Sequence, residues 1–407
     1  MYYSPLRLAL GGLGLVTSSA LATNLYVSSY SGDITSLRLS QSDNGSYALA
    51  VVATNRGSAP SPAWLEKEPG KGVVYCMDEG LPVPNGSISS YRTSPCGELT
   101  LIDRHTTISG PVSSVVYNKG KAMAAAHYGG SAVTTWNILP TGGLSPLQNF
   151  TFKLSAPGTN PGRQDAPHPH EAIVDPTDSF IIVPDLGADL LRVFSIDPAT
   201  SALTPSKSFS TPPGSGPRHG AFSVSGCADI KNQECLASKA DTYFFVVSEI
   251  SNNVTSYKVT YGNKTLDFTE VFTTGIYGNQ TTPVGAAAGE ALISPDNKFL
   301  LTSSRNATLF SIPNFDSTNS TKIPSDTLQS WSIDHTTGKL SFRQSAPAGG
   351  SFPRQFSVNQ KGTLVAVGLQ LSSRVVIMER NPSDGTFGKF VAEVGVTGDV
   401  TSVIWDE

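Results

Sequence analysis

The chain of 407 residues is 39% hydrophobic and 15% charged, which provides enough apolar material for a sizeable core and excludes a disordered protein. Its net charge of −4 excludes a broad basic surface of the kind that binds nucleic acid. Length alone predicts two or three domains, but a repeat fold escapes this count because each repeat packs only on its neighbours.

The first 22 residues have the pattern of a secretory signal peptide. Arg7 precedes a short apolar stretch over residues 8–16, and Ala20-Leu21-Ala22 has the small residues of a cleavage site. We therefore expect residues 1–22 to be removed and residues 23–407 to form one secreted domain, extracellular or in the cell wall. A short membrane anchor or a buried N-terminal helix is the alternative. No run in the chain is long and apolar enough to span a bilayer, so no membrane partner is expected.

Two other features agree with secretion. Asn-x-Ser/Thr sequons, the acceptors of N-linked glycans, begin at Asn44, Asn85, Asn149, Asn253, Asn263, Asn279, Asn306 and Asn319. The four cysteines are an even number, which in a secreted chain predicts two disulfides. Of three possible pairings we expect Cys76–Cys96 and Cys227–Cys235, because each pair flanks a loop that contains Gly, Pro or Asn. A zinc site is the weaker alternative, since neither spacing matches Cys-x-x-Cys.

Short β-rich runs recur along the chain, and helical periodicity is nearly absent. The runs cover residues 25–29, 73–77, 180–183, 242–248, 299–303 and 363–368, and each is followed by a second alternating strand. Several pairs then reach a turn of the type Asp-x-x-Thr-Gly-x-Leu, which is clearest at residues 334–340. Such a pattern predicts an all-β protein built from repeated antiparallel units.

Seven segments open on a Gly, Pro or Ala corner that leads into a strand. They are Pro62-Ala63-Trp64, Gly110-Pro111-Val112, His168-Pro169-His170, Gly216-Pro217-Arg218, Ala288-Gly289-Glu290, Phe352-Pro353-Arg354 and Gly398-Asp399-Val400. Their spacing brackets the ~40–50 residues of a propeller blade. The last opening has room for one strand, which would complete the blade that the N-terminal strands begin. We predict a seven-bladed β-propeller; a β-helix or a pair of sandwiches is the competing architecture.

Polar side chains at the blade openings are the candidates for chemistry, because the innermost strands of a propeller line its central channel. His168 and His170 lie together at one opening, and imidazoles suit proton transfer near neutral pH. Arg218 and Arg354 share a Pro-Arg dipeptide at equivalent repeat positions, which predicts two guanidiniums that could bind a carboxylate. The alternatives are an ordinary polar loop for the histidines and ion pairs with neighbouring blades for the arginines.

Further candidates stand where apolar strands end. Glu249 and Arg305 follow equivalent strands of successive repeats and could be a structural ion pair or an acid–base group with an anion anchor. His219, Glu290 and Gln370 occupy related repeat positions. Motifs of other chemistries are missing from the sequence, among them Gly-x-Ser-x-Gly, a phosphate-binding loop and His-Glu-x-x-His. His168-Pro169-His170 is a weak metal signal without a third ligand.

These segments resemble the seven-bladed lactonase family, which includes bacterial 6-phosphogluconolactonases and fungal 3-carboxy-cis,cis-muconate cyclases. Residues 168–189 are similar to its His-Pro-His strand and Val-Pro-Asp-Leu-Gly turn. Gly216-Pro-Arg-His219, Ser248-Glu249, residues 294–305 and Phe352-Pro-Arg354 also fit family positions. The resemblance covers residues 24–405, and the chain looks like a secreted, fungal-type member.

The resemblance implies a site in the channel that needs no metal or cofactor. It implies that four residues do the work: His170, Arg218, Glu249 and Arg305. We expect the proton to move through His170 and Glu249. The substrate-binding side chains would be Arg218, Arg305, Arg354, His168, His219, Glu290 and Gln370.

From this we expect a monomeric enzyme that forms or opens a lactone ring on a small carboxylate, in the manner of the carboxymuconate cyclases. A sugar-lactone hydrolase of the 6-phosphogluconolactonase type is the first alternative. A secreted propeller glycoprotein that binds a ligand or partner without catalysis is the second; a channel plugged by apolar side chains would favour it.

Overall fold

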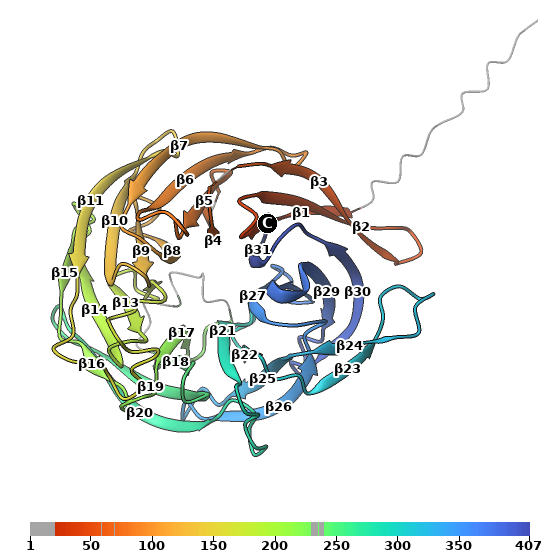
Figure 1. Ribbon diagram of the computed structural model, residues 1–407. Helices are drawn as coiled ribbons and strands as arrows, with labels where there is room; N and C mark the ends of the chain where they lie inside the picture. The colour runs from red at the N-terminus through yellow and green to blue at the C-terminus, as the bar shows by residue number, and fades with distance from the viewer. Residues whose placement is uncertain (1–20, 58, 69, 229–234, 236–239) are drawn as a thin grey trace, which may run out of the picture.

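The computed structural model describes residues 21–57, 59–68, 70–228, 235 and 240–407. They form a ring of seven β-sheets around a central axis, with the innermost strand of every sheet facing that axis (Figure 1). This confirms the predicted seven-bladed β-propeller. Residues 1–20 of the predicted signal peptide lie outside the described residues, while Leu21 and Ala22 begin the first strand. Within the described ranges, no helix has the length and apolar character needed to cross a membrane.

All strands in each blade are antiparallel, and in every blade except the one that closes the ring the chain order runs outward from the axis. Two blades consist of β4 (Pro62–Glu68), β5 (Val73–Asp78), β6 (Gly86–Thr93), β7 (Leu99–Thr107) and of β8 (Pro111–Tyr117), β9 (Ala122–His127), β10 (Ala132–Ile138), β11 (Leu144–Thr151). The next two consist of β12 (Ile173–Val174), β13 (Phe180–Asp185), β14 (Leu190–Ile196), β15 (Leu203–Pro205) with β16 (Phe209–Ser210), and of β17 (Pro217–Val224), β18 (Thr242–Ser248), β19 (Asn253–Tyr261), β20 (Leu266–Gly275).

Counted along the chain from the blade that begins at residue 21, the sixth sheet of the ring contains β21 (Ala287–Ile293), β22 (Phe299–Arg305), β25 (Thr327–Ile333) and β26 (Leu340–Pro347). A separate hairpin of β23 (Phe310–Pro313) and β24 (Lys322–Ser325) is inserted between its second and third strands. The seventh contains β27 (Pro353–Val358), β28 (Leu364–Leu369), β29 (Arg374–Arg380) and β30 (Phe387–Gly395), with the short 3₁₀ helix η1 (Gln370–Ser372) after β28.

The ring is closed by a blade that contains both ends of the chain. The C-terminal strand β31 (Val400–Trp405) is innermost, followed outward by β1 (Leu21–Ser29), β2 (Ile34–Gln41) and β3 (Tyr47–Asn55). Val27 pairs with Val403, and both are fully buried. This pairing confirms the predicted closure and gives β1 a hydrogen-bonded partner on both of its edges.

The second strand of each blade is buried on both faces because it lies between two neighbouring blades. All six residues of β5, β9, β13 and β28 are buried, and so are all seven of β18 and β22. A strand covered on both faces reads as a continuous apolar run. This explains why all six β-rich runs in the sequence are second strands, and why the inner strands were marked by their corners instead.

All seven predicted openings lie at the start of an innermost strand or, in the blade of β12, just before it. In four of these strands the pairing with the second strand skips the residue after the proline: Ala63, Val112, Arg218 and Arg354. A bulge of this kind redirects the side chain of the skipped residue. The same bulge in two blades therefore places Arg218 and Arg354 at equivalent positions around the axis.

The cysteine prediction is half right. Cys227 and Cys235 form a disulfide with their Cα atoms 5.7 Å apart. The predicted Cys76–Cys96 disulfide is wrong, because both thiols are free. Cys76 lies in the middle of β5 and packs among apolar side chains toward the neighbouring blade, whereas Cys96 is exposed in the turn after β6. A residue that points into an interface between blades cannot reach a turn at the edge of the same sheet.

Two thiols of different reactivity are therefore expected per chain. Cys96 should react with Ellman's reagent in the native protein, because it is exposed. Cys76 should react only after unfolding in denaturant, since burial also raises the pKa of its thiol above the ordinary value. Absorbance titration before and after denaturation measures both. No free thiol in the unfolded protein, or a peptide cross-linked through Cys76 and Cys96, would contradict this assignment.

Candidate active site

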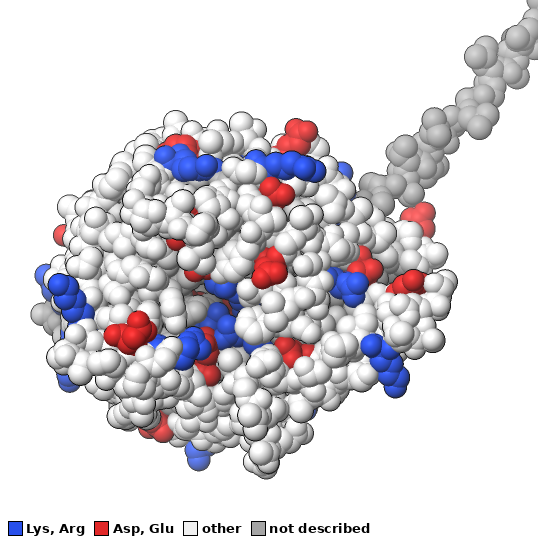
Figure 2. Space-filling model, in the orientation of Figure 1, with Lys and Arg blue, Asp and Glu red and all other residues white. Residues whose placement is uncertain are grey.

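The candidate residues gather at one mouth of the channel because of strand direction. In an antiparallel pair the start of the inner strand lies beside the end of the second strand. Pro217 thus pairs with Ser248, the residue before Glu249, and Ala287 pairs with Arg305. Openings and strand ends that are far apart in the sequence therefore meet around the axis. The space-filling view shows a central hollow in which basic and acidic side chains are visible (Figure 2).

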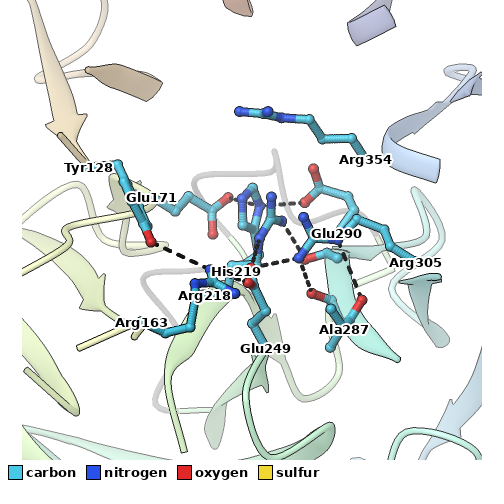
Figure 3. A network of polar contacts seen from close by, with 12 residues as sticks. Tyr128, Arg163, Glu171, Arg218, His219, Glu249, Ala287, Glu290, Arg305 and Arg354 are labelled. Carbon is cyan, nitrogen blue, oxygen red and sulfur yellow. Dashed lines mark hydrogen bonds and ion pairs between the residues drawn. The ribbon is translucent and has the colours of Figure 1, made fainter. Parts of the chain in front are cut away.

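The carboxylate of Glu249 is the centre of an ion-pair network (Figure 3). Its Oε2 lies 2.9 Å from Nε of Arg218 and 2.6 Å from Nη2 of Arg305. Its Oε1 contacts the guanidinium of Arg163, which comes from the loop before β12. Arg218 Nε has the distance but not the alignment of a hydrogen bond, so this contact is an ion pair. Three guanidiniums from three parts of the chain thus share one carboxylate.

Charge in this network is not balanced. Burial acts to raise the pKa of Glu249, but Arg305, Arg218 and Arg163 together lower it to about 2. Burial, followed by the charge of Arg305, lowers the pKa of Arg218 to about 9 in spite of Glu249. Near neutral pH Glu249, Arg218 and Arg163 are therefore ionised, and three guanidiniums face one carboxylate. The surplus is suited to bind an anion or to stabilise a developing negative charge.

Arg218 and Arg305 are fixed from behind by the backbone of β21. Nη1 of Arg218 donates to the carbonyl of Gly289 at 2.7 Å, and Nη2 of Arg305 donates to the carbonyl of Ala288 at 3.1 Å. A Cβ at Gly289 would lie 2.5 Å from Oγ of Ser303, so only glycine fits this approach between strands. The two guanidiniums are thus held in place before any ligand arrives.

His219 lies between two carboxylates next to this network. Its Nδ1 is 2.8 Å from Oε1 of Glu290 and 3.5 Å from Oε1 of Glu171. Burial, followed by the charge of Glu290, raises the pKa of Glu171 well above its usual range. Burial lowers the pKa of His219, partly offset by Glu290. Glu171 therefore keeps its proton more readily than an ordinary carboxyl group, beside the hydrogen bond between His219 and Glu290.

Within the described ranges, one group of His, Cys, Asp or Glu side chains has the spacing of a metal site, and it consists of these three residues. Their ligand atoms all lie within 4.8 Å of one another. Direct contact of His219 with Glu290, beside the charges of Arg218 and Arg305, fits a shared proton better than a cation. His168-Pro169-His170 was the weak metal signal in the sequence. Both ring nitrogens of His168 are within hydrogen-bond distance of other groups of the protein.

His170 is the side chain with unused capacity for proton transfer. Its ring packs edge-on against His219 and Tyr128, with centroids 5.0 and 5.7 Å away. Its Nδ1 is buried and has no hydrogen-bond partner among the described residues. Burial, followed by the charge of Arg218, lowers the pKa of His170 well below 6.5. The imidazole is therefore neutral at physiological pH and is able to accept a proton.

The remaining candidates are at the mouth but outside the Glu249 network. His168 bonds to the Tyr128 carbonyl at 2.9 Å and to Asp165 at 3.0 Å, and its ring stacks on Tyr128. Arg354 donates at 2.7 Å to the hydroxyl of Tyr30, which follows β1, and pairs at 3.2 Å with Glu79, which follows β5 in the blade beyond that one. Gln370 is buried at the start of η1, and its Oε1 has no partner in the described structure.

His168 thus holds Tyr128 in place, and Arg354 forms an ion pair with another blade, although with the second blade along the ring and not with the neighbouring one. Figure 3 shows Arg354 apart from the group around Glu249.

Sequence reasoning missed several contributors to the site. Arg163 lies in a loop without repeat signature, so only its place in the folded chain reveals it. Glu171 stands directly after His170 and could have been included from that adjacency. Trp64 comes from another blade, yet its ring centroid lies 5.8 Å from that of His219. Its Nε1 donates to Glu66 at 3.4 Å, and burial raises the pKa of Glu66 to about 8.

Residues 24–405 match the protein family described as "Lactonase, 7-bladed beta-propeller". The chain is similar to a "Probable 6-phosphogluconolactonase" of the fungus Arthroderma benhamiae, with 30% identity over 91% of this chain and 86% of that protein. It is also similar to the 6-phosphogluconolactonase of Bacillus subtilis, with 22% identity over 83% of this chain and 85% of the relative.

Two solved structures have closely similar folds. A putative 6-phosphogluconolactonase of Bacteroides fragilis superimposes with a TM-score of 0.76 and 22% identity, covering 96% of this chain and 99% of the other. A periplasmic gluconolactonase of Pseudomonas aeruginosa gives a TM-score of 0.76 and 24% identity, covering 95% and 99%. At these identities the structures support the fold.

Removing the charge of Glu249 should destabilise the protein strongly. Glu249→Gln leaves three guanidiniums without their carboxylate, and loss of one partner from a buried ion pair costs about 3–5 kcal/mol. A glutamate that titrates near 4.5 when unfolded and at about 2 when folded contributes stability above pH 4.5, which is lost as the pH falls toward 2. The difference between the two proteins should therefore shrink in acid. Urea unfolding at pH 7 and at about pH 3 measures it.

Glu98→Gln, at an exposed glutamate in the turn before β7, is the matched control and should unfold like wild type. Equal stability of Glu249→Gln and wild type at pH 7 would show that the arginines do not depend on this carboxylate.

Proposed function

Since the chain belongs to the seven-bladed β-propeller lactonase family, we propose that it hydrolyses the ring ester of a sugar lactone at the mouth of its channel. The observation that carries this proposal is the place of His170. A buried, neutral imidazole with an unpartnered Nδ1 lies beside guanidiniums that are fixed before substrate binds. A base and a stabiliser of negative charge are the two things that ester hydrolysis by water requires.

In this mechanism water adds to the carbonyl carbon of the lactone and passes a proton to Nδ1 of His170. The carbonyl oxygen becomes an oxyanion, which Arg218 and Arg305 stabilise. The bond between that carbon and the ring oxygen then breaks, and the proton moves from His170 to the leaving oxygen. The product is an open chain with one new carboxylic acid and one new hydroxyl. Loss of a single preorganised donor to such an oxyanion typically lowers the rate ~10²–10³-fold.

Glu249 has a different part in this scheme from the one expected from sequence. A carboxylate whose pKa is lowered to about 2 is a weak base, and three arginines already occupy its oxygens. It holds the guanidiniums in position rather than moving a proton. The proton is left to His170, with the Glu171, His219 and Glu290 group beside it as a reserve of exchangeable protons.

The comparisons favour the sugar-lactone alternative over the cyclase reading that the sequence placed first. The similar proteins named above are 6-phosphogluconolactonases and a gluconolactonase, and none of them is named as a cyclase. Polar and ionisable side chains at the mouth also argue against a propeller that only binds a partner, because an apolar plug was the feature expected there.

His170→Asn should lower turnover of the sugar lactones by about 10²–10⁴-fold, the usual contribution of a general base. A pH-stat assay on 6-phosphogluconolactone and on gluconolactone, corrected for spontaneous hydrolysis, measures it. Because the pKa of His170 is held well below 6.5, kcat/KM of the wild type should stay level down to that pH and fall only in more acidic solution.

His105→Asn is the matched control, because His105 lies on the outer strand β7 and should leave turnover unchanged. Full activity of His170→Asn, or no hydrolysis of either lactone by folded wild-type protein, contradicts the proposal.

A further inference from the structure

Arg163 differs from the other two arginines on Glu249 in exposure. Its side chain is 41% exposed, whereas those of Arg218 and Arg305 are 2% and 9% exposed. Apart from Glu249, its guanidinium is bonded only at 3.4 Å to the hydroxyl of Tyr128, counting the contacts found in the described chain. Among the described residues, no backbone carbonyl accepts a hydrogen bond from the guanidinium of Arg163, in contrast to the guanidiniums of Arg218 and Arg305. Arg163 is therefore the guanidinium that can leave Glu249 at the lowest cost.

The backbone that carries Arg163 is firmly anchored. The next residue, Gln164, is fully buried; it donates to the carbonyl of Leu186 at 3.0 Å and accepts from the amide of Asn160 at 3.0 Å. The amide of Arg163 itself donates to the carbonyl of Asn160 at 2.9 Å. The loop is thus fixed up to the Cα of Arg163. Movement at this place is confined to a long side chain that can swing without displacing the loop.

Arg163 also lies at the entrance to the buried groups. Tyr128, whose hydroxyl it contacts, packs edge-on against His170 and stacks on His168. A ligand that reaches His170 from solvent therefore passes close to the exposed guanidinium. The surplus of positive charge around Glu249 is available there to a group with negative charge.

We propose that Arg163 determines specificity for lactones that carry an acid group, by turning from Glu249 to bind that group at the entrance. The proposal rests on the proposed function, because it assumes that sugar lactones and their open-chain acids are the ligands. Arg218 and Arg305 stay on Glu249 and serve the reacting ester. A phosphate monoester is the preferred acid group, because its charge of about −2 and three acceptor oxygens suit a guanidinium best.

The test compares two acids that differ only in a phosphate, 6-phosphogluconate and gluconate, by calorimetric titration of wild type and Arg163→Ala. We expect Arg163→Ala to weaken 6-phosphogluconate about tenfold, as for loss of one charged hydrogen-bonding partner, and gluconate less than twofold. Arg163→Lys should restore part of the difference, because it keeps the charge but not the fork of donors. Arg56→Ala, at an exposed arginine in the turn after β3, is the control and should bind both acids like wild type.

Kinetics give a second readout that a merely structural role would not produce. Arg163→Ala should raise KM for 6-phosphogluconolactone and leave kcat for gluconolactone near the wild-type value. An equal loss for both acids, no loss for either, or no binding of 6-phosphogluconate by wild type would overturn the proposal. Binding is measured without turnover, so an inactive protein that still discriminates through Arg163 would contradict only the proposed hydrolysis. An active one that does not discriminate would contradict only the role of Arg163.

Discussion

The carboxylate of Glu249 holds together groups that would otherwise repel one another. Three guanidiniums converge on its two oxygens, one from its own blade, one from the next blade and one from a loop. Without this negative charge, Arg218 and Arg305 could not remain buried beside each other, since burying unpaired cations is costly. The low basicity of His170 beside them follows first from its burial and then from the same concentration of positive charge.

The geometry of a propeller brings these side chains together around the axis and requires only single-residue differences between the blades. Four blades repeat the same proline corner, and the bulge after the proline redirects one side chain in each of their inner strands. Two of the four have an unreactive residue there, Ala63 or Val112, and two have an arginine. Chemistry is thus added to the ring by changing single residues, while the buried second strands keep the blades packed.

Features that repeat along the chain could be predicted from the sequence. The seven corners predicted the inner strands, the closing blade and the shared mouth for Arg218, Arg305 and Glu249. The family resemblance predicted a catalytic role for His170 and not for the other two mouth histidines, His168 and His219. The predictions of position succeeded because the register of an antiparallel blade converts a position in the repeat into a position around the axis.

Features set by packing between repeats could not be predicted in this way. Cys76 and Cys96 flank one loop in the sequence, but the pleat of β5 turns Cys76 into the neighbouring blade. Arg163 has no repeat position, and its contact with Glu249 depends on how Gln164 anchors the loop. The weak basicity of Glu249 depends on three partners at once, of which sequence reasoning had named two.

The most direct test of this account is a crystal structure of the protein with 6-phosphogluconate, the open-chain acid, bound. The account predicts the acid in the central hollow, with its carboxylate near Arg218, Arg305 and His170 and its phosphate bound by Arg163. A ligand bound at the outer edge of the blades, with all three arginines still on Glu249, would contradict the claim that this ion-pair network is the substrate site.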